Sequence, residues 1–465
     1  MLRAHYRILL ILVLALLLRL YHVTYPFLDH HSWRQTDTAA VARNFYRDHF
    51  NLLRPEMDRF GSGPAVVELE LQVTPFLTSL LYVVWGVRDW VGRIVPILFS
   101  LGSVVYFYRL VALHFGERLA LFSSFVFIIL PLNVFFSRVL MPEAGALFFT
   151  LAAVYHFSAY LGKEATVQYV LAAVFAALAF LAKLSNLYIL IVFVALATRK
   201  GWRGLVSDGR FFAFLLLSLA PAVAYYGYLH LAADVKMMPY QVGTDKWGNV
   251  QLWTNPVFYQ VLAQRFRTLV FTEPGLLMLL AGLFFPLSHS VFRLWLMAAL
   301  AYVFVVANGN LVHTYYQMPL LPAGAFFIGL VLDRTYSSAR LRPLTAVLCG
   351  LLFARALMIL GPLYGMYAYP AYEAAKGLSE IDTSASPVVS VPHRRDMAPE
   401  LLYYADRKGW VVWPDQLGAE SIAQFRDQGA KYVVVTDYRT LPDGVKRDID
   451  RLERWQRDLV LIARL

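Results

Sequence analysis

Long apolar runs separated by short polar segments occupy the chain from near its first residue to about residue 365. A transmembrane helix needs about 20 mostly apolar residues, and these runs reach or approach that length. The pattern predicts an all-α polytopic membrane protein with about eleven transmembrane helices. The eleven runs are residues 8–18, 94–113, 119–136, 144–161, 168–182, 184–198, 211–231, 275–287, 291–307, 318–332 and 344–363.

The first run has two interpretations, because Arg3 and Arg7 precede it as they would precede the apolar part of a signal peptide. No small-residue cleavage site follows, since the next residues are Arg19, Leu20 and Tyr21. We therefore expect a retained first membrane helix.

Basic residues predict which side of the membrane each loop occupies. If the N-terminus is cytoplasmic, alternation places Arg118, Arg293 and Arg334 in short cytoplasmic loops, where Lys and Arg are normally enriched. Residues 72–87 are also apolar enough to cross, but a crossing there would put these loops outside, so we expect an interfacial or re-entrant helix. The outer side then receives residues 24–93, 137–143, 232–274 and 308–317, together with the tail after residue 365.

The tail changes character at about Leu378, where short β-rich runs begin to alternate with helical stretches. Such alternation is typical of a small α/β unit. The predicted organisation is a transmembrane domain over residues 1–365, with a long outer loop at 24–93, and a C-terminal α/β domain over 378–465. An odd number of spans makes that domain extracytoplasmic.

Composition supports a membrane protein and excludes several other classes. The chain is 59% hydrophobic and 16% charged, whereas soluble proteins have about 25% charged residues. Cys349 is the only cysteine, which excludes an intrachain disulfide and Cys-based metal sites. The basic residues behind the net charge of +11 lie beside apolar runs. Their position favours interaction with membrane lipid, and not with nucleic acid, as the explanation of this charge. Apart from Lys183 and Arg355, few ionisable residues interrupt the runs, which argues against an ion-coupled transporter.

The start of the long outer loop has the highest density of residues that could take part in a reaction. Residues 29–37 contain two carboxylates, Asp29 and Asp37, together with Trp33 and Arg34. A carboxylate partly buried at a membrane interface has a raised pKa and can serve as a general base. The alternative interpretation is a solvated loop whose charges pair with one another.

Two further polar segments lie at predicted outer helix ends. Arg138 and Glu143 occupy a short turn, where charges are costly unless they are paired or functional, and a simple helix-end ion pair is the alternative. His313, Tyr315 and Tyr316 lie in the other segment. Tyrosines there are ordinarily membrane-interface anchors, and the neighbouring histidine raises the interest of the segment.

Taken together, these segments resemble the GT-C superfamily of membrane glycosyltransferases, and more closely the bacterial relatives of protein O-mannosyltransferases and lipid A aminoarabinose transferases. The residues that carry the resemblance are 40–45 (AVARNF), 70–77 (ELQVTPFL), 136–143 and 181–183 (LAK). Two positions depart from the family pattern. The positions of the family's Asp-Glu pair in the first loop are occupied here by Arg34 and Gln35. The position of the family's lysine in the interfacial segment lies near Leu71, and no lysine is present there.

The resemblance implies a GT-C-like fold in the bacterial inner membrane and transfer of a sugar, usually with inversion. The donor would be a polyprenyl-phosphate sugar and the acceptor a glycolipid, glycan or protein at the outer face. Asp37 or Asp29 would be the base, and Glu143 would position the acceptor or join Asp37 in binding a divalent metal, the only cofactor implied. The substrate-binding residues would be Arg34, Arg138 and His313 at the phosphate, Trp33, Tyr315 and Tyr316 along the sugar or prenyl groove, and Glu70.

Two other classes of function remain open at this point. A flippase for a lipid-linked saccharide would share the lipid groove, but it would need more polar residues through the bilayer than these runs contain. A non-catalytic membrane scaffold would tolerate neutral replacements at Asp29, Asp37 and Glu143.

Overall fold

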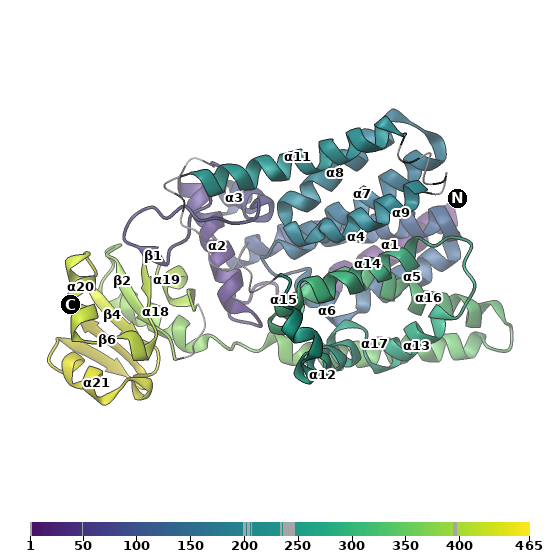
Figure 1. Cartoon of the computed structure of the whole chain (residues 1–465). Coiled ribbons are helices and arrows are strands. Elements are labelled where there is room, and N and C mark those ends of the chain that lie inside the picture. Colours follow the sequence, from purple (N-terminus) through teal and green to yellow (C-terminus); the bar gives the residue numbers. More distant parts are fainter. Residues whose placement is uncertain are drawn as a thin grey trace.

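The computed structural model describes residues 2–465 except 49, 199–200, 202–204, 206, 233–234, 236–246 and 394–397. Part of the predicted outer loop at 232–274, residues 233–234 and 236–246, therefore lies outside the described residues. Figure 1 shows a bundle of helices with a β-sheet at one end, and two helices of the long loop, α2 and α3, between them.

Helices form nearly all of the described chain up to residue 381. The α-helices of this part are α1 Leu2–Leu20, α2 Ser32–Arg47, α3 Val73–Trp85, α4 Asp89–Phe115, α5 Glu117–Ile129, α6 Pro131–Phe136, α7 Glu143–Lys163, α8 Thr166–Ala182, α9 Ile189–Ala197, α11 Gly209–Leu231, α12 Pro256–Arg265, α13 Glu273–Leu283, α14 Val291–Val305, α15 Ala307–Val312, α16 Leu321–Ser337, α17 Arg342–Leu360 and α18 Tyr369–Ile381. Shorter 3₁₀ segments are η1 Leu184–Tyr188, η3 Val250–Thr254, η5 Thr314–Leu320 and η6 Gly361–Tyr364, and η4 Phe266–Val270 is a π-helical turn.

Helix ends follow local sequence signals. The side chains of Asp208 and Thr272 cap α11 and α13 by accepting hydrogen bonds from backbone N–H groups of the first turn. Pro131 starts α6 directly after α5 has ended, because proline has no N–H to continue a helix. These breaks divide apolar runs that look continuous in the sequence.

The chain is a multi-pass membrane protein, but eleven spans are not confirmed. Among the described residues, five helices have the length and composition to cross a membrane, and Pro256–Val270 with Glu273–Leu283, bent by 101°, makes a sixth. All eleven predicted runs do form helices, yet several are short, such as the 17 residues of α8 and the 15 of α14. Helix α3 has 13 residues, about 20 Å at 1.5 Å per residue, which is less than the hydrocarbon thickness of about 30 Å. The five helices are Asp89–Phe115, Glu143–Lys163, Gly209–Leu231, Thr314–Ser337 and Arg342–Ile381.

The last part of the chain folds into a sheet flanked by helices. The strand order is β1-β3-β2-β4-β6-β5, in which β3, β2 and β4 are parallel and the other pairs antiparallel. The strands are β1 Phe60–Gly61, β2 Val388–Val391, β3 Gly409–Val411, β4 Tyr432–Val435, β5 Arg454–Arg457 and β6 Val460–Arg464, and the remaining helices are α19 Glu400–Tyr404, η7 Pro414–Gln416, α20 Ala419–Asp427, η8 Tyr438–Thr440 and α21 Asp443–Ile449.

Side-chain alternation explains how the sheet is covered on both faces. Val388 and Val434 pack with residues of α18 and α19, whereas Val389 and Val433 pack with residues of α20 and α21. Helix α18 thus joins the sheet from Tyr369 onward, earlier than the predicted start near Leu378. That this part is a separate, extracytoplasmic domain stays a prediction.

Candidate functional site

Four segments that are far apart in the sequence meet at the end of the bundle that faces the sheet. They are the start of α2, the stretch around Glu70, the start of α7, and η5. Figure 1 shows α2 between the bundle and the sheet. Helix α2 is unusual because most of its buried residues are polar or small. Buried polar groups require partners, so the position of α2 is set by ionic and hydrogen-bonded contacts.

The first of these contacts joins Arg34 to Glu70. An Arg34 Nη atom lies 2.6 Å from Glu70 Oε1, and both side chains are nearly buried. The Glu70 stretch is itself fixed to the break after α8, because Leu71 N–H donates to the carbonyl oxygen of Leu181 at 2.9 Å. The bond at Leu181 brings Lys183 into the same neighbourhood.

Lys183 is a member of the site that the sequence analysis did not select. Its ammonium lies 2.8 Å from Glu143 Oε1, 4.3 Å from the ring centre of Tyr316 and 5.0 Å from that of Tyr315. Glu143 Oε2 is buried and has no hydrogen-bond partner among the described residues. The signal that could have identified Lys183 was a lysine inside an otherwise apolar stretch, where charge is costly unless it is used.

Asp37 lies one helical turn beyond Arg34 on α2. Its Oδ1 is 3.2 Å from Arg59 Nε, while its buried Oδ2 has no hydrogen-bond partner in the part of the chain that the structure describes. Burial raises the pKa of Asp37, an effect that the charges of Arg59 and Arg34 oppose and that of Asp58 reinforces. Arg59 therefore holds one oxygen of the Asp37 carboxylate, and the other oxygen has no partner among the described residues.

Asp29 has a different environment. Its Oδ1 accepts from Gln35 at 2.5 Å, and its Oδ2 lies 3.1 Å from Arg138 and 3.5 Å from Arg93. Both arginines are fully buried, and Arg138 also donates to the carbonyl oxygen of His22 at 2.7 Å. Asp29 and Arg138 thus form a separate buried cluster that attaches the first loop to α4 and to the turn before α7. Within the described part of the chain, the ionic partners of Asp29 and Arg138 lie in this cluster and not around Glu143.

Aromatic and imidazole rings form the adjoining wall. His313 stacks on Tyr315 with ring centres 5.1 Å apart and lies 5.9 Å from Trp33, so these three predicted residues come together. His31 lies 5.1 Å from Tyr315 and within 3.2 Å of the Thr314 hydroxyl. Burial, followed by the charges of neighbouring basic groups, holds the pKa of His31 well below its usual value. The wall is therefore built mainly from neutral rings.

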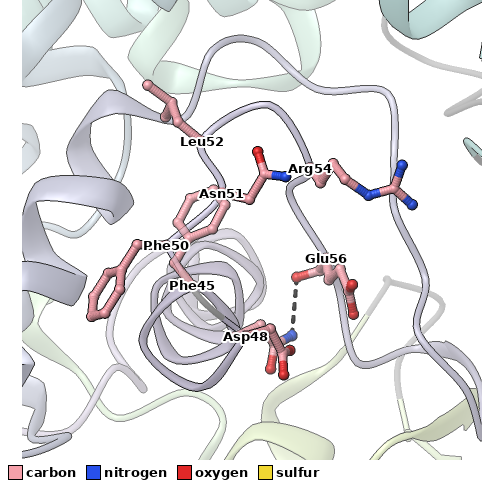
Figure 2. A pocket seen from close by; sticks show the side chains of 8 residues that line it. Phe45, Asp48, Phe50, Asn51, Leu52, Arg54 and Glu56 are labelled. Carbon is pink, nitrogen blue, oxygen red and sulfur yellow. Dashed lines mark hydrogen bonds between the residues drawn. The ribbon is translucent and has the colours of Figure 1, made fainter.

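A small cavity opens between the charged groups and this wall. Its lining includes Glu143, Lys183 and Tyr315, together with Tyr188, Tyr302 and Met318. A second, larger pocket lies at the other end of α2, lined among others by Asn44, Asp48, Asn51 and Glu56 (Figure 2).

The predicted metal site has no complete ligand set in this arrangement. Arg59 and Lys183 occupy the space beside Asp37 and Glu143 that a cation would need. Among the described residues, no group of three or more His, Cys, Asp or Glu side chains could hold a metal ion. We therefore derive no step through a metal.

Comparisons with known proteins agree on one fold. Residues 72–226 match the family described as dolichyl-phosphate-mannose-protein mannosyltransferase, and no curated protein matches the chain by sequence. ArnT from Cupriavidus metallidurans in the apo state is similar in structure, with a TM-score of 0.67 at 14% identity over 99% of this chain and 98% of that chain. The same protein bound to undecaprenyl phosphate gives 0.65 at 12% over 98% and 97%.

A third similar structure comes from a different glycosyltransferase. It is the archaeal oligosaccharyltransferase AglB from Archaeoglobus fulgidus, in complex with an inhibitory peptide and a dolichol-phosphate. Its TM-score is 0.55 at 13% identity, over 93% of this chain and 69% of that chain. The chain thus shares the fold of these glycosyltransferase structures, and residues 72–226 match the mannosyltransferase family.

Proposed function

We propose that this protein transfers a sugar from a polyprenyl-phosphate-linked donor to a glycolipid, glycan or protein acceptor at the outer face of the bacterial cytoplasmic membrane. The observation that carries the proposal is a buried cluster beside Arg34 and Lys183. In it, two carboxylates, Asp37 and Glu143, each keep one oxygen without a hydrogen bond to any described residue. Structures of similar fold bind undecaprenyl phosphate and dolichol-phosphate.

The chemistry requires a base and a cationic site for the leaving group. A polyprenyl phosphate is already a good leaving group, so the protein has to remove the acceptor proton and stabilise the departing negative charge. The acceptor oxygen forms a bond to the anomeric carbon, the bond from that carbon to the phosphate oxygen breaks, and the proton goes to the base. The products are a glycosylated acceptor of inverted configuration and polyprenyl phosphate.

Asp37 is the better of the two candidate bases. Its Oδ2 remains available for an acceptor hydroxyl, whereas both oxygens of Asp29 are already bound by Gln35, Arg93 and Arg138. Asp29 and Arg138 are accordingly assigned to holding the first loop in place and not to contact with substrate.

The other residues divide between phosphate and sugar. Lys183, Arg34 and His313 hold the leaving phosphate. Lys183 lines the cavity, His313 stacks on Tyr315 of its lining, and the charge of Arg34 acts on Tyr315 and Glu143. Glu143 and Glu70 orient these cations and leave an oxygen of Glu143 for a sugar hydroxyl. Trp33, Tyr315 and Tyr316 provide ring faces for the sugar or the first prenyl units.

The test is transfer from radiolabelled polyprenyl-phosphate sugars to membrane extract by the purified protein, with Asp37→Asn as the inactive variant. Asp48→Asn is the matched control, because Asp48 is an exposed carboxylate at the far end of the same helix. Transfer by wild type and the control but not by Asp37→Asn would support the proposal. Movement of intact donor across the bilayer without any bond change would overturn it in favour of a flippase.

A further inference from the structure

A two-residue strand of the long first loop belongs to the C-terminal sheet. Strand β1 pairs antiparallel with β3, with Phe60 opposite Trp410 and Gly61 opposite Gly409. Gly409 N–H also donates to the carbonyl oxygen of Asp58 at 2.8 Å. Gly61 has a φ of +119°, a conformation that residues with a Cβ rarely adopt.

The same stretch of loop is anchored on its other side to α2. The Asp58 carboxylate accepts from Arg43 at 2.5 Å and from Asn44 Nδ2 at 3.0 Å. Asn44 Nδ2 also donates to the carbonyl oxygen of Glu56 at 3.1 Å, the dashed line in Figure 2. Glu56 in turn pairs with Lys408, the residue that precedes β3, at 3.2 Å. Residues 56–61 are thus clamped between α2 and the edge of the sheet.

Arg59 lies inside this clamp, directly before β1. Its Nε is 3.2 Å from Asp37 Oδ1, and its guanidinium lies over the Phe60 ring at 4.7 Å from the ring centre. The Arg59 side chain is only 10% exposed. The neighbours Asp58 and Phe60 hold the backbone of Arg59 in place. The pairing of β1 with β3 therefore determines the position of the Arg59 guanidinium.

We propose that Arg59 is a positioning residue for Asp37, and that the C-terminal sheet holds Arg59 in place by pairing β3 with β1. The inference rests on the proposed function, because it assigns Asp37 the role of base. Arg59 binds Oδ1 and so orients Oδ2 toward the acceptor. The C-terminal part is therefore a component of the active site.

Loss of Arg59 has a distinguishable effect on Asp37. The charged groups that act on Asp37 are Arg59, Arg34 and Asp58, and the two arginines lower its pKa against the effect of burial. Without the Arg59 charge, Asp37 protonates at a higher pH. The acidic limb of the pH–rate profile then moves upward, which loss of folded protein alone does not cause.

The experiment combines a local variant with a distant one. Arg59→Met removes the guanidinium, and Trp410→Ala loosens the pairing from the β3 side, where the Trp410 ring packs against Gly61. Trp455→Ala is the matched control, because Trp455 lies on β5 at the opposite edge of the sheet and packs against Tyr432. All are full-length proteins, compared at temperatures where each is folded.

Arg59→Met and Trp410→Ala should lower kcat on the order of 10- to 100-fold with little change in acceptor KM, and should move the acidic limb upward. Compared with Arg59→Met, Arg59→Lys should recover part of kcat and return the acidic limb toward its wild-type pH. Trp455→Ala should leave the pH–rate profile unchanged. The double variant Arg59→Met/Trp410→Ala should be no slower than Arg59→Met alone. Fully additive losses, or an unshifted profile in both single variants, would overturn the proposal.

A readout that does not depend on catalysis separates this inference from the proposed function. Hydrogen–deuterium exchange of residues 56–62 should quicken in Trp410→Ala and stay at the wild-type rate in Trp455→Ala. Unchanged exchange in Trp410→Ala would overturn the clamp whatever the activity. Quickened exchange in Trp410→Ala, combined with a wild-type protein that transfers no sugar, would instead contradict the proposed function while leaving the clamp in place.

Discussion

Asp37 Oδ1 lies 3.2 Å from Arg59 Nε, and this contact joins helix α2 to the stretch directly before β1 within the long first loop. The contact leaves Asp37 Oδ2 buried without a hydrogen bond among the described residues. An ionisable group that is half satisfied and fully buried costs stability, so its presence indicates a functional demand on that oxygen. The following predictions depend on this asymmetry and on the contacts around it.

Transfer should depend on the ionised form of Asp37. Burial raises the pKa of this carboxyl above its ordinary value of 3.8, partly offset by Arg59 and Arg34. Because a base must be deprotonated, activity should fall as the pH drops through that raised pKa, and should be constant above it on the acidic side of the profile. The measurement is kcat/KM against pH with a fixed donor, and an acidic limb at or below the ordinary value would contradict the assignment.

Lys183 and Glu143 should act as a unit. Lys183→Met should weaken donor use on the order of 10- to 1000-fold, because the leaving phosphate loses a cation in a buried site. Glu143→Gln should add less to Lys183→Met than it costs alone, with a coupling of about 0.5–3 kcal/mol in a double-mutant cycle of kcat/KM.

Lys376→Met provides the control for this cycle. Lys376 also lies over a tyrosine ring, that of Tyr372 at 4.3 Å, but on the exposed surface of α18. Its replacement should leave transfer unchanged, and independent effects of Lys183→Met and Glu143→Gln would contradict the pairing.

Asp29→Asn should mainly destabilise the protein. Removing one member of a buried ionic cluster leaves uncompensated charge, here Arg93 and Arg138, at a cost of about 3–5 kcal/mol. The expected result is a lower unfolding temperature in detergent, with the shape of the pH–rate profile preserved where the variant is folded. Loss of transfer in a variant of unchanged stability would instead make Asp29 the base.

Acid should loosen the contact between α2 and the C-terminal part. The hydrogen bond from Arg47, with the charges of Arg43 and Arg47, lowers the pKa of Asp406 in the folded protein. A carboxyl whose folded pKa is depressed stabilises the fold above its unfolded pKa, near 3.9, and that contribution disappears as the pH falls through the folded pKa.

Thermal unfolding across this pH range tests the linkage. Asp406→Asn should lower the Tm at neutral pH, and its difference from wild type should shrink as the pH falls below about 4. Asp427→Asn, at an exposed position of α20, controls for the change in net charge. A difference that does not vary with pH would show that Asp406 acts through packing alone.

The position of the site within the chain could be predicted from local composition. Carboxylates, arginines and histidines next to apolar runs are costly unless they are paired or used, and this argument selected Arg34, Asp37, Glu143 and His313, which the structure gathers at one end of the bundle. The same argument could not divide them into groups. Asp29 and Asp37 are eight residues apart in one loop. Asp29 is nevertheless enclosed by two arginines, whereas one oxygen of Asp37 has no hydrogen bond to the part of the chain that the structure describes.

Apolar runs determined that the chain is a multi-pass membrane protein with helices at all eleven runs, because burying apolar side chains and satisfying the backbone in lipid leave few alternatives. Only the tertiary structure decided how many helices are long enough to cross, where breaks such as those at Pro131 and Lys183 fall, and that Lys183 faces Glu143. It also decided that β1 of the first loop pairs with β3, more than 300 residues later. Contacts between distant segments depend on how the whole chain packs, and no local pattern contains that information.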